Sequence, residues 1–344
     1  MFQTSIIFIS LLSIVSSCSW NQNEIKKLSK LENEIKFAPQ DDEEKKLLEK
    51  FSVENEEPPL NVESKKEIKA LKTIKPKVPA KKITRIEKVD PSQAADYPKD
   101  LLVLKETSQV IWSKFKEVFS TGEKSYLDID YMGMTVGKIL IGVHAPKVMN
   151  NKQVHHFYAK FKSAPFYSAL YELDDQVETF VMKDSFTPIR FNLIQRESKQ
   201  DIDEFQIFDV DNLYTKAFSH LRRKDKERKK DWKGYIPERF VDAFSVVFFL
   251  RGLPLESGDK YTIPIVNKGS TILLNCEVIG VESIEVLSKT VKAIKVKAFS
   301  HYSGKTLKSG DMTFWFSHEK NHEVLKVKAK ISLGSVYAEK AEAP

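Results

Sequence analysis

The sequence is poor in features that would identify a chemistry. It has two cysteines and 12 glycines among 344 residues, and the apolar stretch 6–15 is only about ten residues long. A stretch of that length is too short to span a bilayer, which needs roughly 20 residues. We find no glycine-rich phosphate loop, no Ser-His-Asp order with supporting context and no carboxylate pair with convincing spacing. We therefore expect a protein that is not an enzyme and that needs no cofactor.

The stretch 6–15 instead has the length of the central part of an export signal, although no lysine or arginine precedes it. It is followed by the letters VSSC, which end at Cys18. This order resembles the lipobox of bacterial lipoproteins and implies a signal peptide at 1–17 and lipidation of Cys18. Ser19 resembles the sorting state of outer-membrane lipoproteins. The alternative is an ordinary cleaved signal with a coincidental cysteine.

The second cysteine, Cys276, lies in the alternating apolar segment TILLNCEVIG. With Cys18 lipidated, Cys276 has no partner for an intrachain disulfide. We interpret it as a small buried residue without a redox role.

A charge-rich region follows the lipobox and covers residues 18–96. Residues 41–57 carry eight acids against three bases, and residues 65–88 carry ten bases against two acids. Segregated charges with interspersed prolines cannot bury enough apolar surface to fold, so we expect a largely disordered tether. Short helices at 23–36 and 41–51 would be marginal alone. The basic block is either a solvated linker or a contact with an anionic surface.

From residue 97 to 340 the pattern becomes that of a folded domain. Residues 100–122 have apolar side chains near helical spacing and predict one amphipathic helix. Residues 236–258 begin near Pro237, are apolar on almost every side and predict a buried helix. The remaining segments alternate with period two and predict antiparallel strands with one wet face: 124–132, 134–143, 153–163, 176–183, 187–196, 204–210, 213–221, 260–266, 271–281, 290–301, 311–317 and 323–337.

A flat open sheet of a dozen strands is unusual. We therefore expect a mainly β domain: a large curved antiparallel sheet or incomplete β-barrel with one buried helix, one flanking amphipathic helix and the disordered charged linker before it.

Four stretches, in this order, resemble the bacterial family known as domain of unknown function 3108. They are YLDIDYMGMTVGK, SAPFYSALYELDDQVETF, VDAFSVVFFLRGLPLESGDKYTIPI and MTFWFSHEKNHEVLKVKAKISLGSVYAE. The resemblance covers residues 120–340 and implies an exported envelope protein. It also implies a fold similar to the periplasmic carriers of lipoproteins, which enclose an apolar cavity; this is analogy of fold. The turn SHEKNH departs from the family pattern.

Two groups of residues are candidates for binding. The first would line a cavity closed by the buried helix and consists of Phe166, Tyr167, Tyr171, Phe240, Phe244 and Phe248. The second lies in HLRRKDKERKKDWKGY, has seven bases within residues 222–230, and could contact anionic phosphates or glycans; it consists of Arg222, Arg223, Lys224, Arg228, Lys229 and Lys230. The alternative for the second group is a solvated hairpin tip that joins a strand to the following helix.

Other polar residues favour structural interpretations. His318 and His322 have the spacing of a zinc motif, but they lie in a turn, so we expect no metal site. His155 and His156 point to opposite faces of a strand and cannot share an ion. Buried charges need partners, so we expect Asp242 and Arg251 each to pair with a strand residue or loop backbone.

The sequence thus favours a non-enzymatic outer-membrane lipoprotein that faces the periplasm and binds an apolar or amphiphilic envelope component, a lipid or a lipoprotein. The first alternative is an envelope scaffold that contacts peptidoglycan or another envelope protein through its basic segments. The second is a hydrolase of envelope glycans, which a pair of carboxylates facing one cleft would indicate. We expect no nucleic acid partner.

Overall fold

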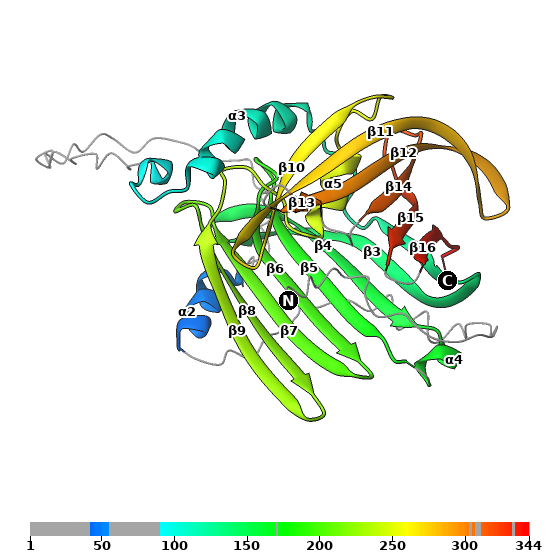
Figure 1. Ribbon diagram of the computed structural model, residues 1–344, viewed down its shortest axis with the longest axis horizontal. Coiled ribbons are helices and arrows are strands. Elements are labelled where there is room, and N and C mark those ends of the chain that lie inside the picture. Colours follow the sequence, from blue (N-terminus) through cyan, green and yellow to red (C-terminus); the bar gives the residue numbers. More distant parts are fainter. Residues whose placement is uncertain are drawn as a thin grey trace, which may run out of the picture.

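The computed structural model describes residues 42–54, 90–169, 171–302, 305–306, 311–331 and 334–343. These ranges form one large antiparallel sheet with short helices packed on it (Figure 1). The sheet has sixteen strands, of which fourteen follow one hydrogen-bonded path. Those fourteen are β2 (Lys124–Tyr131), β3 (Met134–Met149), β4 (Lys152–Ser163), β5 (Asp174–Met182), β6 (Pro188–Glu197), β7 (Gln200–Asp209), β8 (Tyr214–Arg223), β9 (Lys226–Tyr235), β10 (Lys260–Asn267), β11 (Ser270–Val286), β12 (Lys289–Tyr302), β14 (Met312–Ser317), β15 (Val324–Lys330) and β16 (Ser335–Lys340).

The strand order is β10-β11-β12-β14-β15-β16-β2-β3-β4-β5-β6-β7-β8-β9. The strands thus form two runs of antiparallel hairpins, and β16 returns to pair with β2 in the middle of the sheet. Strands β9 and β10 are the two ends of the path. The predicted mainly β class, with a large antiparallel sheet that is not closed, is confirmed.

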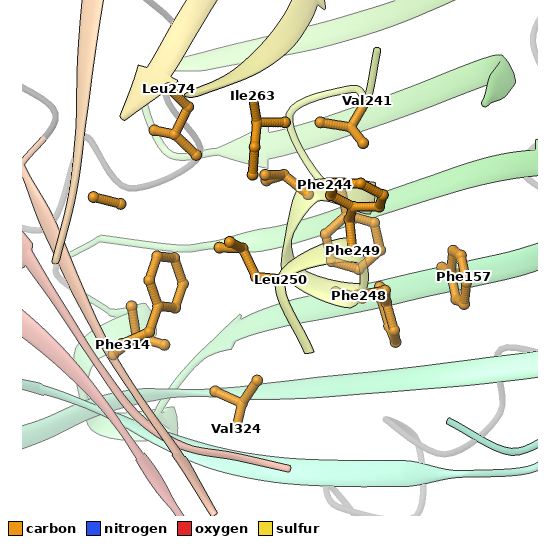
Figure 2. Packing of buried hydrophobic residues seen from close by; sticks show 14 of the residues in the cluster. Phe157, Val241, Phe244, Phe248, Phe249, Leu250, Ile263, Leu274, Phe314 and Val324 are labelled. Carbon is orange, nitrogen blue, oxygen red and sulfur yellow. The ribbon is translucent and has the colours of Figure 1, made fainter. Parts of the chain in front are cut away.

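The main core lies between helix α5 (Ser245–Arg251) and the face of the sheet that we call the inner face. Both runs of hairpins contribute to it. Figure 2 shows Phe248 of α5 beside Phe157 of β4, and Leu250 between side chains of β10 to β15 such as Ile263 and Phe314. We call the opposite side of the sheet the outer face.

Helix α5 is much shorter than the helix predicted for residues 236–258. The chain before it is extended at Val241, which forms a parallel bridge with Ile265 of β10. The apolar residues of 236–244 are buried against the sheet without being helical, because tertiary contacts rather than helical periodicity place them.

The predicted flanking helix is α3 (Lys99–Lys114), and it ends before the residue predicted. Phe115 is extended instead, because its ring packs against Phe186 and Phe249. The next residue, Lys116, donates its backbone N–H to the carbonyl of Gly252 at 2.8 Å. A Cβ atom on Gly252 would lie 2.3 Å from the Phe115 ring, so only glycine permits this close approach.

Residues 42–54 depart from the expected disordered tether. They form α2 (Asp42–Lys50) and β1 (Val53–Glu54), and β1 pairs with β3 on the folded domain. The helix predicted at 41–51 is α2, and the one predicted at 23–36 lies outside the described residues. The remaining short elements are a 3-10 turn at Pro91–Gln93, α4 (Pro165–Ser168) and β13 (Lys305–Thr306), which pairs with β12.

Candidate functional site

Asp242 fixes the start of α5. It is buried, and its Oδ1 accepts hydrogen bonds at 2.8 Å from the backbone N–H groups of Phe244 and Ser245. The Ser245 hydroxyl accepts one from the Asp242 N–H at 3.0 Å, and the Thr179 hydroxyl of β5 donates to Asp242 Oδ2. Burial raises the pKa of Asp242, and these donors oppose the rise. The carboxyl group therefore caps the helix and attaches it to the inner face.

Arg251 fixes the other end of α5. Its Nη1 donates to Glu123 Oε1 at 2.6 Å, and its Nε and Nη2 donate to the Asn321 carbonyl at 3.2 and 3.0 Å. The ring of His322 bonds the Arg251 carbonyl through Nδ1 at 2.7 Å. The predicted pairing of Asp242 and Arg251 with strand residues and loop backbone is confirmed.

The three helix-side residues of the predicted cavity are buried among the chain's own rings. Phe248 stacks on Phe157 at 4.0 Å between ring centroids, and Phe240 packs against Phe208 at 5.1 Å. Phe244 meets Phe248 edge to face at 5.7 Å. These contacts fill the space between α5 and the inner face (Figure 2).

The other three predicted cavity residues lie around α4. Tyr167 is buried, with its hydroxyl 3.6 Å from Met134 Sδ, whereas Phe166 is 39% exposed. The Tyr171 hydroxyl donates to Glu197 Oε2 at 2.6 Å. Tyr167 belongs to the main core together with Phe240, Phe244 and Phe248, so four of the six predicted residues share one buried cluster.

The predicted basic segment is the β8–β9 hairpin, in which β9 is a strand rather than the predicted loop. Residues paired across antiparallel strands point to the same face. Leu193 of the main core pairs with Glu204, which pairs with Ser219, which pairs with Lys230. Lys230 is therefore on the inner face, and because strand side chains alternate, Lys226 and Arg228 are there too.

The acids of β9 point the other way. Glu227 and Asp231 alternate with the three bases and lie on the outer face. The inner side of β9 therefore carries only positive charge along Lys226, Arg228 and Lys230, which are all exposed. Next to Arg228, in the same row of the sheet, lie Leu221 and Ile202. The structure thus places a basic row beside an apolar strip, and we call the two together the inner basic row.

The other predicted basic residues are divided between the two faces and the turn. Arg222 pairs with Asp203 at 2.6 Å on the outer face, and Lys229 lies on the same face. Arg223 pairs with Lys226 on the inner face, and its Nε and Nη2 donate to Gln200 Oε1 at 3.1 and 2.7 Å. Lys224 is in the exposed turn. Of the six predicted bases, Arg223, Arg228 and Lys230 lie on the inner face, and Arg228 and Lys230 belong to the inner basic row.

Sequence reasoning missed a residue that joins this row from a distant segment. Lys268, in the β10–β11 turn, lies 2.8 Å from Glu204 Oε2 through its Nζ and 5.3 Å from the centre of the Trp232 ring. Lys230 approaches the same ring at 5.6 Å. The Lys268 N–H also donates to Gln206 Oε1 at 3.1 Å. No sequence signal linked Lys268 to β9, because the contact depends on how the sheet curves.

The same contact brings the two ends of the sheet together. A Cβ atom on Gly234 of β9 would lie 2.4 Å from the carbonyl oxygen of Gly269. Glycine is therefore required where the β10–β11 turn crosses β9. The inner basic row lies next to this crossing.

Asp175 and Glu197 form a pair of carboxylates at the α4 end of the inner face. Gln195 Nε2 donates to Asp175 Oδ2 at 3.1 Å and to Glu197 Oε1 at 3.4 Å. Burial raises the pKa of Asp175 to about 7. Its Oδ1 accepts from the Arg196 N–H at 3.0 Å, so protein donors occupy both of its oxygens. This buried carboxyl group is therefore held by hydrogen bonds from the chain's own donors.

His155 and His156 lie on opposite faces of β4, as predicted. His155 contacts Phe119 and Phe157 on the inner side, with its Nε2 3.3 Å from Glu117. His156 stacks on Phe180 of the outer face, and its Nε2 lies 3.3 Å from Glu178. Within the described ranges, no group of three or more His, Cys, Asp or Glu side chains could hold a metal ion.

Cys276 is buried in β11, and burial raises the pKa of its thiol to about 12. The interpretation as a small buried residue agrees with this environment. Cys18 lies outside the described residues. None of the described helices is both long enough and apolar enough to cross a bilayer.

Solved structures with a partly similar fold come from three bacteria. A β-barrel-like protein of domain of unknown function DUF1849 from Brucella abortus is 12% identical, with a TM-score of 0.40 over 64% of this chain and 95% of its own. A candidate exported protein with a YmcC-like fold from Bacteroides fragilis is 11% identical, with a TM-score of 0.30 over 66% of this chain and 97% of its own. A candidate lipoprotein from Parabacteroides distasonis is 14% identical, with a TM-score of 0.29 over 67% of this chain and 98% of its own.

A search of curated proteins gave no match. The family described as Protein of unknown function (DUF3108) matches residues 127–340, from the first long strand to the last. This range includes α5 with its two anchoring residues and the inner basic row. The chain therefore belongs to the DUF3108 family.

Proposed function

We propose that the chain is a non-enzymatic lipoprotein of the cell envelope whose β domain binds an anionic amphiphile, a lipid or the acylated end of a lipoprotein, at the inner basic row. The observation that carries this proposal is the sorting of charge along β9. Lys226, Arg228 and Lys230 share the inner face, while the acids of the strand face outward. Ammonium and guanidinium groups would bind the head group of the ligand.

The apolar strip favours an amphiphile over a simple anion as the ligand. Leu221 is half-buried and Ile202 is buried, and both lie in the row of Arg228. An acyl chain placed on this strip would run from the charged edge across Leu221 and Ile202 toward Gln195, which pairs with Ile202 in the same row. The rings of Phe244 and Phe248 already fill the space under α5, so the proposed ligand binds along the sheet and not beneath the helix.

The alternative explanation of the basic residues on β9 is that they only protect an edge strand from aggregation, as lysines often do. That explanation requires charge but not its sorting to one face. The experiment therefore compares the two faces of the same strand. Arg228→Glu with Lys230→Glu reverses the inner charge, and Lys229→Glu with Lys233→Glu reverses two exposed outer lysines as the matched control.

Both variants would be tested by flotation with vesicles that contain an anionic phospholipid and with purely zwitterionic vesicles. We expect the inner variant to lose about tenfold or more in binding to anionic vesicles and the outer variant to lose less than about twofold, since head-group contact needs the inner charges. Leu221→Ser should weaken binding to the vesicles but not to inorganic phosphate. Equal losses in both charge variants would refute a face-specific site.

The membrane attachment is a separate part of the proposal, and the lipobox-like sequence at Cys18 supports it. We propose that Cys18 carries the lipid, on the outer membrane and facing the periplasm. Cys18→Ala should then release the protein from the membrane fraction. If the variant stays in the detergent-extracted fraction, the attachment does not use this cysteine.

The packed interior favours one second candidate. A domain whose inner face is filled by its own Phe240, Phe244 and Phe248 can also serve as a rigid scaffold. In that case the basic segments would contact peptidoglycan or another envelope protein. Co-sedimentation with purified peptidoglycan, lost on deletion of residues 65–88, would support the scaffold over amphiphile binding.

A further inference from the structure

We propose that the outer face of the sheet carries a groove for an extended peptide of a second protein, and that residues 51–54 occupy this groove as a displaceable internal ligand. The groove consists of two apolar pockets and the overhanging edge of β3. The docking segment, Phe51–Glu54, is the part of the chain seated in it. This proposal does not depend on amphiphile binding, which concerns the inner face.

The first pocket holds an aromatic ring. Phe51 is 2% exposed and packs in a cluster with Phe205 and Ile207 of β7, against Phe218 of β8. This cluster is separate from the main core. The ring of Phe51 thus fills a surface pocket built by strands far away in the sequence.

The second pocket holds an aliphatic side chain two residues later. Val53 packs against a cluster that includes Met149 of β3 and Ile189 of β6 and is also separate from the main core. Ser52, between the two, is exposed. Phe51 lies in the turn that ends α2, where the Ser52 N–H donates to the Glu49 carbonyl at 3.3 Å, and the extended part begins at Val53. The segment thus presents an aromatic and an aliphatic side chain, separated by one residue, to two pockets.

The backbone of the segment is bound as well as its side chains. β3 extends beyond its partner β2, and Val53 and Glu54 pair with Met149 and Val148 of this overhang. Such strand addition binds any extended peptide through its main chain.

A buried arginine completes the main-chain recognition. Arg190 of β6 donates from Nη1 to the carbonyl of Phe51 at 3.0 Å, although only 3% of it is exposed. Asn192 holds it in place by accepting from Arg190 Nε at 3.0 Å. A positively charged donor directed at a backbone carbonyl suits a peptide of variable sequence, whereas a permanently packed core would be served by apolar contact.

The docking segment can leave without opening any hairpin of the sheet. It lies outside the path of fourteen strands and contributes only the two-residue strand β1. The preceding residue, Lys50, adds a half-exposed ion pair with Asp209 at 3.4 Å, which is weak in water. A competing peptide with the same pattern could therefore take its place. An internal ligand has a high effective concentration and would weaken the apparent affinity of any external peptide.

The test uses the full chain and a fluorescein-labelled peptide that corresponds to residues 47–56. Phe51→Ser in the chain empties the first pocket, and we expect it to raise the affinity for the peptide by about tenfold or more over the wild-type chain. Fluorescence anisotropy measures both affinities. A peptide with alanine at position 51 should lose about tenfold or more, and one with alanine at position 52 should lose less than about twofold, because Ser52 lies outside both pockets.

Three results would overturn the proposal. If the Phe51→Ser chain keeps its wild-type circular dichroism and melting transition but does not bind the peptide, the groove does not accept external segments. If that chain loses its cooperative transition, the segment is an obligatory part of the fold. A concentration-dependent dimer of the wild-type chain that Phe51→Ser abolishes would assign the groove to a second copy instead of another protein.

Discussion

Replacing Asp242 with alanine should lower the free energy of unfolding by about 3 kcal/mol. The substitution removes the acceptor for the N–H groups of Phe244 and Ser245 and for the Thr179 hydroxyl. Loss of a helix cap costs about 1 kcal/mol. Each buried donor left without an acceptor costs about 1–3 kcal/mol, and release of the desolvated carboxyl group offsets part of this.

Asp242→Asn is the matched variant because it keeps the shape and one acceptor oxygen. We expect it to cost about 1 kcal/mol, since the Oδ1 bonds to the helix remain and the charge assistance is lost. Burial raises the pKa of Asp242. As the pH rises, the unfolded state loses the Asp242 proton at a lower pH than the folded state does. The contribution of Asp242 to the free energy of unfolding therefore falls with rising pH, and asparagine removes this dependence.

Urea unfolding of the three chains, followed by tryptophan fluorescence at several pH values, would measure these differences. At about 2–4 °C per kcal/mol for a domain of this size, the alanine variant should also melt roughly 6–12 °C lower. A loss below about 1 kcal/mol for alanine, or equal losses for alanine and asparagine, would refute the assignment of Asp242 as the cap that attaches α5 to β5.

Further predictions concern packing and pH. Phe248→Ala should cost about 4 kcal/mol in urea unfolding, because it removes a fully buried ring stacked on Phe157; a cost near 1 kcal/mol would mean that the space under α5 is already loosely filled. Gly252→Ala should cost more than about 2 kcal/mol, because its methyl group would collide with the Phe115 ring, and a neutral effect would contradict that close approach. Burial lowers the pKa of His155 to about 4. As the pH drops from about 6.5 to 4, the unfolded state binds this proton before the folded state does, so the free energy of unfolding should fall. His155→Phe should reduce this fall by about 2 kcal/mol, measured by urea unfolding at pH 7 and pH 4.5. Burial raises the pKa of Asp175 to about 7, so Asp175→Asn should be more favourable relative to wild type at pH 8 than at pH 4, and a pH-independent difference would refute the raised pKa.

The alternation of apolar and polar residues was sufficient to predict most of the strands, because one face of each packs on the core. It failed at β9, where both faces are charged and the outer part of the strand is exposed, so no apolar period exists. It also joined β15 and β16 into one segment, although β15 ends at Lys330 and Gly334, at positive φ, directly precedes β16. The length of α5 was overestimated, because burial on all sides looks the same for a helix and for an extended segment inside a sheet.

The candidate site was only partly predictable for a related reason. The basic segment was evident from composition, but the sorting of Arg228 and Lys230 from Lys229 needed the strand and its register. Lys268 reaches Trp232 from another hairpin, and no local pattern encodes that approach. Asp242 and Arg251 were recognisable because isolated charges in apolar sequence require partners.

The pairing of β16 with β2 determines when the sheet can be completed during folding. These two strands are far apart in sequence but adjacent in the centre of the sheet, in register from Val336 with Tyr131 to Lys340 with Leu127. As the chain emerges from its N-terminal side, the strands from β2 to β9 can pair in turn, but one edge of β2 stays open until the last strand arrives. An open edge is a template for aggregation, and such long-range closure is slow. The nascent domain therefore keeps an aggregation-prone edge until its final strand has been made.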